Sequence, residues 1–133
     1  MTTDLGRLPS VVKTITQRQL DNYARASGDH NPLHLDAQFA ATTQFGGIIA
    51  HGMLTLAFIS EMMLTAFGKN WLETGSLKVR FRGAAYVGDE VETWGTVDKK
   101  DLQGCHQLVV CSVGVRNRNS GQEIISGTAT VKL

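Results

Sequence analysis

The sequence predicts an α+β fold in which a curved antiparallel sheet wraps around one long apolar helix. Two observations support this prediction. Residues 51–67 (HGMLTLAFISEMMLTAF) have the length of a helix and are apolar on nearly every side, which is typical of a helix that other structure surrounds. From residue 77 onward, apolar and polar residues alternate as they do in strands with one buried face. The chain has 133 residues, of which 42% are hydrophobic, so we expect one folded domain over residues 1–133.

The first part of the chain contains short elements with clear boundaries. Residues 10–15 form an apolar run that suits a first strand. Thr16 and Gln19 have the spacing of a capping box, which predicts the start of a helix. Gly28 suits the position after that helix ends. A short second helix is expected over residues 37–42.

The central helix is expected over residues 51–67. One helical stripe contains its spaced apolar residues, but further apolar side chains lie off that stripe, so we expect neighbouring structure to cover every side of this helix. The residues on the stripe are Met53, Leu56, Ala57, Met63, Leu64 and Phe67, and those off it are Leu54, Phe58 and Ile59.

The strands follow as alternating segments. We expect them at residues 77–82, 90–98, 106–115 and 123–133, with a hairpin turn at residues 117–121. The strand at 77–82 (LKVRFR) has one apolar face and one basic face, which predicts that only one side is buried.

Charge and composition exclude several classes of function. Thirteen Lys and Arg residues stand against 12 Asp and Glu residues, a net charge of +1, so neither a nucleic-acid partner nor a polybasic membrane contact is expected. The longest stretch without these charged residues, 37–60, contains Gln, Gly and His residues that disfavour a membrane span. Asp4 and the lack of an early apolar stretch argue against a signal peptide.

The two cysteines, Cys105 and Cys111, are expected in one strand or hairpin arm. At strand rise they would then lie roughly 20 Å apart, too far to form a disulfide. We therefore expect reduced thiols and a cytoplasmic protein.

The densest group of reactive side chains lies in residues 27–36 (SGDHNPLHLD). Pro32 keeps this segment out of a helix, so it forms a stiff loop in which Asp29 and His34 can converge on one water molecule. Asp accepts a proton at neutral pH and His titrates near enough to neutrality to donate one, which suits adding or removing water across a polarised double bond. A plain helix-to-helix turn is the alternative.

A metal site is a weaker interpretation of the same region. The candidate ligands Asp29, His30, His34, Asp36 and His51 lack a sharp ligand spacing, and Pro32 prevents His30 and His34 from sharing a helical face. We therefore expect no metal.

A glycine-rich segment, residues 45–53 (FGGIIAHGM), leads into the central helix. The N-terminus of a helix presents unpaired N–H groups and partial positive charge, and Gly52 lets a substrate approach the backbone. This arrangement suits the oxyanion of a thioester enolate. The alternative is that the glycines serve only a tight turn and close packing.

Together, residues 23–34 (YARASGDHNPLH) and 45–54 (FGGIIAHGML) resemble the two signature blocks of the MaoC-like, or hydratase 2, family. The resemblance implies a hot-dog fold, dimers with sites at the subunit interface, and reversible syn hydration of a trans-2-enoyl thioester to the (R)-3-hydroxyacyl thioester. Carried over, Asp29 activates the water, while His34 holds the same water and protonates Cα. Asn31 supports the loop, the Gly52 N–H binds the thioester oxygen, and Ser60 matches a serine that some relatives place near the catalytic His.

The resemblance implies no cofactor beyond coenzyme A or phosphopantetheine as part of the substrate. A homodimer is expected, with a heterodimer as the alternative, and an acyl carrier protein is a further candidate partner. A (3R)-hydroxyacyl-carrier-protein dehydratase uses the same pair of residues. A hot-dog thioesterase driven by Glu61 and a non-catalytic acyl-binding subunit are the remaining alternatives.

Other residues have two interpretations each. His51 is expected to make a structural hydrogen bond at the helix start, and Glu61 to be exposed or ion-paired. Lys78, Arg80 and Arg82 either meet the phosphates of the carrier or form an ordinary solvated strand face. A last group either lines an acyl tunnel or packs in the core: Met53, Phe58, Met62 and Met63.

Overall fold

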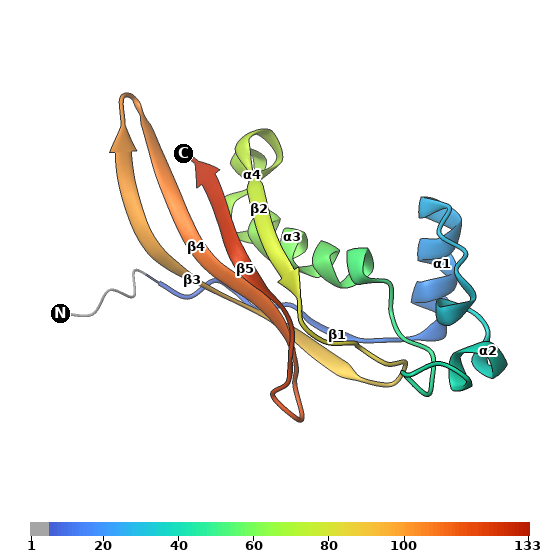
Figure 1. Ribbon diagram of the computed structural model, residues 1–133. Coiled ribbons are helices and arrows are strands. Elements are labelled where there is room, and N and C mark those ends of the chain that lie inside the picture. Colours follow the sequence, from blue (N-terminus) through green and yellow to red (C-terminus); the bar gives the residue numbers. More distant parts are fainter. Residues whose placement is uncertain (1–5) are drawn as a thin grey trace.

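The computed structural model describes residues 6–133, and Asp4, on which the signal-peptide prediction partly rests, lies outside this range. Within that range the chain forms one five-stranded sheet and helices on one side of it (Figure 1). The elements are β1 (Val12–Thr14), α1 (Gln17–Ser27), a 3-10 turn η1 (Pro32–His34), α2 (Ala37–Ala41), α3 (Gly52–Phe67), α4 (Lys69–Thr74), β2 (Ser76–Phe81), β3 (Glu90–Gln103), β4 (His106–Asn117) and β5 (Glu123–Lys132). The predicted α+β class is therefore confirmed.

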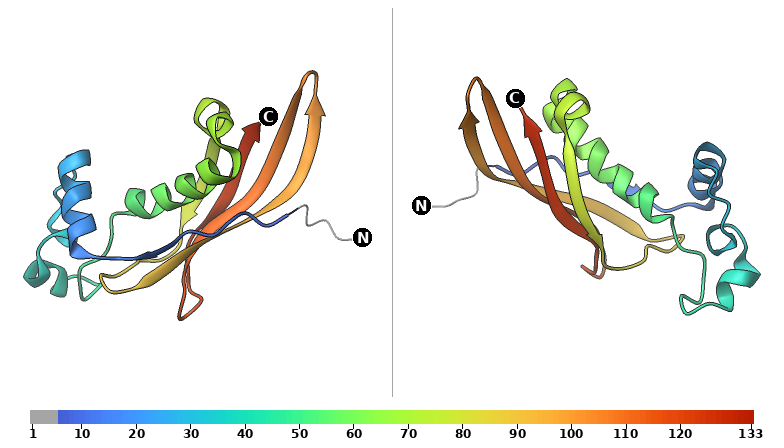
Figure 2. Two further views of the ribbon diagram at one scale, coloured as in Figure 1. Left: turned by 180° about the vertical axis from the view of Figure 1, so that it is seen from behind. Right: turned by 45° about the horizontal axis from the view of Figure 1, so that its top comes forward.

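The sheet is antiparallel throughout, with strand order β1-β3-β4-β5-β2. It curves along its length, and α3 lies against its concave face, while α1 and α2 stand away from the sheet beyond one end of α3 (Figure 2). Alternating apolar residues of β4 and β5 are completely buried, which confirms the one-sided burial predicted from the alternation. They include Val109, Cys111, Val113, Val115, Ile125 and Val131.

The helix α3 is buried along one face and not on every side. The side chains that face the sheet are Thr55, Phe58, Ile59, Met62 and Met63. The prediction that other structure covers every side of the helix is wrong for this chain, because one sheet covers only one face. Met53 remains 56% exposed and Leu64 remains 42% exposed.

The boundaries of α1 follow the predicted signals. Thr16 and Gln19 form a complete capping box, and Gly28 adopts a left-handed φ of 81° at the C-terminal end, where a residue with a side chain would be strained. Leu20 and Ala24 bury the inner face of α1.

Two helical elements were not predicted, η1 and α4. The chain enters α4 through Gly68 at φ 58°, directly after α3 ends, so the sequence shows no separate loop between the two helices. Trp71 of α4 is buried, and its indole N–H donates to the hydroxyl oxygen of Ser60 on α3 at 2.9 Å.

The strand β3 is longer than predicted, continuing past residue 98 to Gln103 and joining β4 through a tight turn that contains Cys105. Cys105 is exposed and Cys111 is buried, and both are free thiols. Burial raises the pKa of Cys111 to about 11. No helix within residues 6–133 is both long enough and apolar enough to cross a membrane.

Candidate active site

The loop after α1 is shaped by its own short polar side chains. The Asp29 N–H donates to Ser27 Oγ at 3.1 Å, and the Asn31 N–H donates to Asp29 Oδ1 at 3.2 Å. Asn31 Oδ1 then accepts from the Leu33 N–H at 2.9 Å and caps the turn η1. These successive Asx-type bonds fix the loop without a helix, so Asn31 supports the segment that carries both predicted catalytic side chains.

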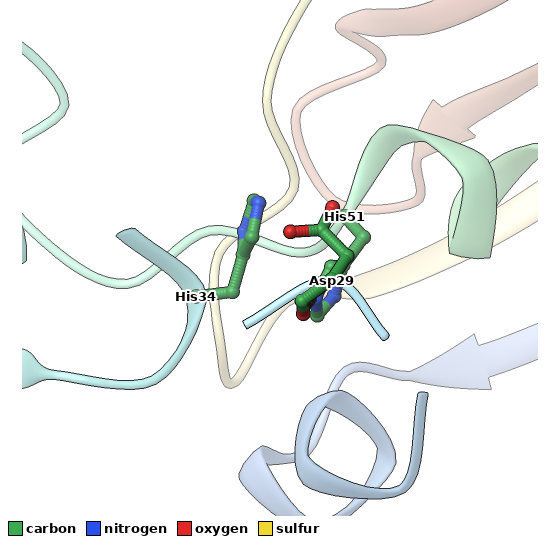
Figure 3. A group of neighbouring side chains, drawn as sticks. All are labelled: Asp29, His34 and His51. Atoms are coloured by element: carbon green, nitrogen blue, oxygen red, sulfur yellow. Dashed lines mark hydrogen bonds between the residues drawn. The ribbon is translucent and has the colours of Figure 1, made fainter. Parts of the chain in front are cut away.

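Asp29 and His34 meet at the end of this loop, together with His51 (Figure 3). One nitrogen or oxygen atom from each of the three side chains lies within 4.8 Å of the others. Figure 3 shows a carboxylate oxygen of Asp29 pointing toward the His34 ring. His34 is only 9% exposed and Asp29 is exposed.

Asp29 and His34 make no direct hydrogen bond with each other, and their polar atoms are no more than 4.8 Å apart. A water molecule that forms two hydrogen bonds of about 2.8 Å at a tetrahedral angle joins atoms separated by about 4.6 Å. The upper limit of 4.8 Å between the two side chains therefore leaves room for one water held by both.

The hydrogen bonds of His34 define its tautomer. Its Nδ1 lies 2.7 Å from the carbonyl oxygen of Ile49, and because a carbonyl only accepts, Nδ1 carries a proton. This leaves Nε2 free to take up or release a proton. The Gln17 side chain also donates to the His34 carbonyl at 3.0 Å, which ties the turn to α1.

His51 links the two members of the pair. Its Nε2 donates to the backbone carbonyl of Asp29 at 3.2 Å, and its ring stacks on the His34 ring at 3.9 Å between centroids. Burial lowers the pKa of His51 from its ordinary 6.5, and the neighbouring His34 lowers it further, while the bond to Asp29 acts in the opposite direction. The side chain does not cap α3. Its structural hydrogen bond holds the Asp29 backbone instead.

The five candidate metal ligands separate in the structure. Asp29, His34 and His51 come together, but Asp36 caps α2 through bonds from the Gln38 and Phe39 N–H groups. His30 is exposed and outside the cluster. His34 Nδ1 and His51 Nε2 are already bonded to backbone carbonyls. The arrangement suits an acid–base pair that acts through a shared water. The prediction of no metal remains a prediction.

A cavity of about 360 Å³ opens beside His34. It is lined by His34 and Gly52 together with apolar side chains that include Phe45, Ile49 and Phe81. Gly52 is the first residue of α3, and for the residues the structure describes its N–H has no acceptor. A Cβ at Gly52 would lie 3.0 Å from the Phe81 ring, so glycine keeps this turn of the helix open to the cavity.

The structure does not bring Ser60 to the pair. Ser60 lies eight residues after Gly52, about 12 Å along the helix axis, and its hydroxyl accepts from Trp71. Glu61 forms an ion pair with Lys13 at 3.2 Å, as expected for a partly exposed carboxylate.

The acyl-tunnel interpretation of the methionines is not supported. Phe58, Met62 and Met63 are buried in the core, Met53 is exposed, and none of them lines the cavity. Core packing is the role that the structure gives to the three buried residues.

Several residues that line the cavity were not predicted from the sequence. Thr55 lines the cavity, and its hydroxyl donates to the Gly52 carbonyl at 2.7 Å. Phe81 reaches the cavity from β2, Ala85 from the loop after β2 and Ile124 from β5. The Ala50 N–H donates to the Ala85 carbonyl and fixes that loop beside α3. These contacts depend on the sheet topology, and no local pattern in the sequence signals them.

Comparison with known proteins points to one family. The family model described as MaoC like domain matches residues 3–130. The (R)-specific enoyl-CoA hydratase of Aeromonas caviae is 36% identical over 131 residues, which cover 98% of this chain and 95% of that protein. The 3-hydroxybutyryl-CoA dehydratase of Methylorubrum extorquens is 30% identical over 132 residues, 98% of this chain and 80% of that protein. The unliganded R-hydratase of Pseudomonas aeruginosa has a TM-score of 0.83 at 31% identity, covering 100% of this chain and 85% of that chain.

Proposed function

Since the chain belongs to the MaoC-like family, we propose that it hydrates trans-2-enoyl thioesters reversibly to (R)-3-hydroxyacyl thioesters. Like the similar proteins, it has a hot-dog fold and is a hydro-lyase. The observation that carries the proposal is the spacing of Asp29 and His34, which suits one shared water beside the cavity that Gly52 lines. Both directions of the reaction appear among the names of the similar proteins, a hydratase and a dehydratase.

The proposed step begins with the enoyl group in the cavity and its carbonyl oxygen at the Gly52 N–H. Asp29 takes a proton from the water while the water oxygen bonds to C3. The π electrons of the C2–C3 double bond move toward the thioester, and the Gly52 N–H stabilises the enolate oxygen. His34, protonated on both nitrogens, donates its Nε2 proton to C2.

The step leaves Asp29 as a carboxylic acid and His34 as a neutral imidazole. Because Asp29 is exposed, its proton returns to His34 through solvent, which resets the pair. Both the hydroxyl oxygen and the proton reach the substrate from the side where the pair lies, so the addition is syn. Dehydration uses the same groups in reverse.

The thioesterase alternative has little structural support. Glu61 is the only carboxylate on α3, and it pairs with Lys13 and does not line the cavity. Hydrolysis would leave the arrangement of Asp29 and His34 without a role. A (3R)-hydroxyacyl-carrier-protein dehydratase is compatible with the same geometry, since it differs in the carrier and not in the chemistry.

The enzyme is further proposed to act as a homodimer whose partner completes the site, with a heterodimer as the alternative. Phe81, which lines the cavity beside Gly52, is 53% exposed, and Met53, the next residue of α3, is 56% exposed. Covering these apolar side chains with a second chain would remove them from water and shield the reacting atoms. Light scattering of the purified protein measures the mass directly. The reduced thiols fit the proposed cytoplasmic location.

The test of the reaction is loss of the enoyl thioester absorbance with crotonyl-CoA, followed by chiral analysis of the product. The proposal predicts rapid loss of the band and an (R)-3-hydroxybutyryl product, with no free thiol. Release of free thiol without hydration would indicate a thioesterase. No loss of the band with enoyl thioesters of short and long chains, on coenzyme A or on a carrier protein, would contradict the proposed reaction.

A further inference from the structure

A row of basic side chains lies on the face of β2 that points away from the core. Lys78, Arg80 and Arg82 alternate with Leu77 and Val79, which pack against the core. The three basic residues are exposed, and none of them forms an ion pair with a carboxylate among the described residues.

The neighbouring strand supplies hydroxyl groups to the same surface. In the antiparallel register, Arg80 lies opposite Ser126 and Lys78 lies opposite Thr128. These residues line a groove of about 360 Å³ together with Arg82 and Gly127. The lining of the groove therefore contains three cations and two hydroxyl groups and no carboxylate, which is the composition of an anion site.

The basic groove differs from the rest of the sheet surface. Arg116 of β4 pairs with Glu92 of β3 at 2.9 Å, and Arg118, just after β4, pairs with Glu90 of β3 at 2.8 Å. Ordinary solvated strand faces carry such mixed charges. The cations of the groove have only neutral neighbours across the strand, so their charge remains available for a ligand.

Arg82 connects the groove to the active-site cavity, because it lines both. Its Nε donates to the Ser126 hydroxyl, while for the residues the structure describes its two terminal nitrogens have no acceptor. From Arg82 to Lys78 the strand rises by about 13 Å. A substrate arm leaving the cavity at Arg82 therefore enters the groove and can follow β2 toward Lys78.

We propose that this basic groove binds the phosphate groups of the thioester carrier, while the acyl group lies in the cavity beside Asp29 and His34. The proposal rests on the proposed function for its substrate. Arginine binds phosphate oxygens through two parallel hydrogen bonds and lysine binds them as a point charge. The phosphates belong either to the nucleotide of coenzyme A or to the phosphopantetheine arm of a carrier protein.

The kinetic test compares a substrate that has phosphates with one that lacks them. In the double variant Lys78→Gln/Arg80→Gln, the KM for crotonyl-CoA is expected to rise about tenfold or more. The kcat and the constants for crotonyl-N-acetylcysteamine are expected to stay within about twofold. Arg82 is left intact because it also lines the cavity. Arg18→Gln, which removes an exposed cation from α1, is the matched control and should leave every constant unchanged.

A binding measurement separates this proposal from the proposed function. Titration calorimetry with coenzyme A, and separately with 4′-phosphopantetheine, requires no turnover. Weaker binding of coenzyme A alone in the double variant assigns the groove to the nucleotide phosphates, and weaker binding of both assigns it to the phosphopantetheine phosphate. Unchanged binding of both ligands, or equal losses with the two crotonyl substrates, would overturn the proposal even if the enzyme is a hydratase.

Discussion

The two ends of α3 have opposite surroundings. At its N-terminal end, Gly52 leaves an open backbone N–H beside a cavity, and Met53 is exposed. Toward its C-terminal end, Met62 and Met63 are completely buried, and Ser60 is bonded to Trp71. The apolar contacts that hold the helix are therefore concentrated away from its first turn. This leaves the unpaired N–H groups of that turn free to bind a substrate.

From this difference between the two ends of α3, we expect substitutions around its N-terminal end to alter activity and substitutions near Ser60 to alter stability. The largest effect is expected for His34→Ala, because it removes the proton donor to C2. The kcat for crotonyl-CoA should fall by about 10²- to 10⁴-fold. Steady-state kinetics measures this, with a melting curve to show that the variant folds.

His30→Ala is the matched control for this variant, because His30 is exposed in the same loop and outside the cluster. It should keep nearly full activity. The double variant Asp29→Asn/His34→Ala should be little worse than the poorer single variant, since both residues act on one water. Multiplied losses in the double variant would argue against the shared water.

A smaller loss of activity is expected for Gly52→Ala. The added Cβ would lie 3.0 Å from the Phe81 ring, so the ring must move into the cavity or the first turn must shift. The kcat/KM should fall by about 10- to 100-fold, as for the loss or displacement of one oxyanion donor. Adding Phe81→Leu, which removes the crowded ring atoms, should restore part of the loss. Full activity in Gly52→Ala would show that the cavity is not crowded at this point.

The pH dependence of stability is expected to arise at the same end of the helix. The pKa of His51 in the folded protein lies below its ordinary 6.5, mainly because of burial. The unfolded chain therefore binds the proton first, and the His51 contribution to stability is present above pH 6.5 and is lost as the pH falls through the folded pKa. Melting temperatures between about pH 8 and 5 should fall less steeply in His51→Gln than in the wild type. Equal slopes would show that His51 is not responsible.

The smallest effect on activity is expected for Ser60→Ala. It removes the acceptor of the Trp71 indole N–H, so the free energy of unfolding should fall by about 1 kcal/mol. Turnover should stay within about twofold of the wild type, because the serine lies away from the cavity. Denaturant unfolding and kinetics of the same preparation measure both quantities. A large loss of turnover without a loss of stability would place Ser60 in the reaction, as the family resemblance first suggested.

Local patterns predicted most of the fold, and long-range contacts account for what they missed. The capping box at Thr16 and the alternation in β4 and β5 depend on nearest neighbours, and both are confirmed. The one-sided burial of α3 was not predicted, because a helix that is apolar on nearly all sides does not show which face meets the sheet. The helix α4 was missed because Gly68 joins it directly to α3.

In the candidate active site, too, the sequence predicted the local features and missed those that depend on long-range contacts. The Asp29–Pro32 turn and the glycine at the start of α3 are local features, so the sequence alone offered Asp29, His34 and Gly52 as candidate site residues. The opposite wall of the cavity comes from β2, β5 and the loop after β2, more than 25 residues from Gly52 in the sequence. The sequence left Arg82 with two interpretations, contact with the carrier phosphates or an ordinary solvated strand face. Its position at the junction of the cavity and the groove depends on the pairing of β2 with β5.

The most direct test of the shared-water account is the kcat of Asp29→Asn compared with that of Asp36→Asn. Both variants change a carboxylate to an amide in the same segment, and Asn keeps the cap that Asp36 provides to α2. The account predicts that Asp29→Asn loses at least about 10²-fold in kcat with crotonyl-CoA. Asp36→Asn should retain the wild-type rate. Equal rates in the two variants, at matched melting temperatures, would contradict the assignment of Asp29 as the base.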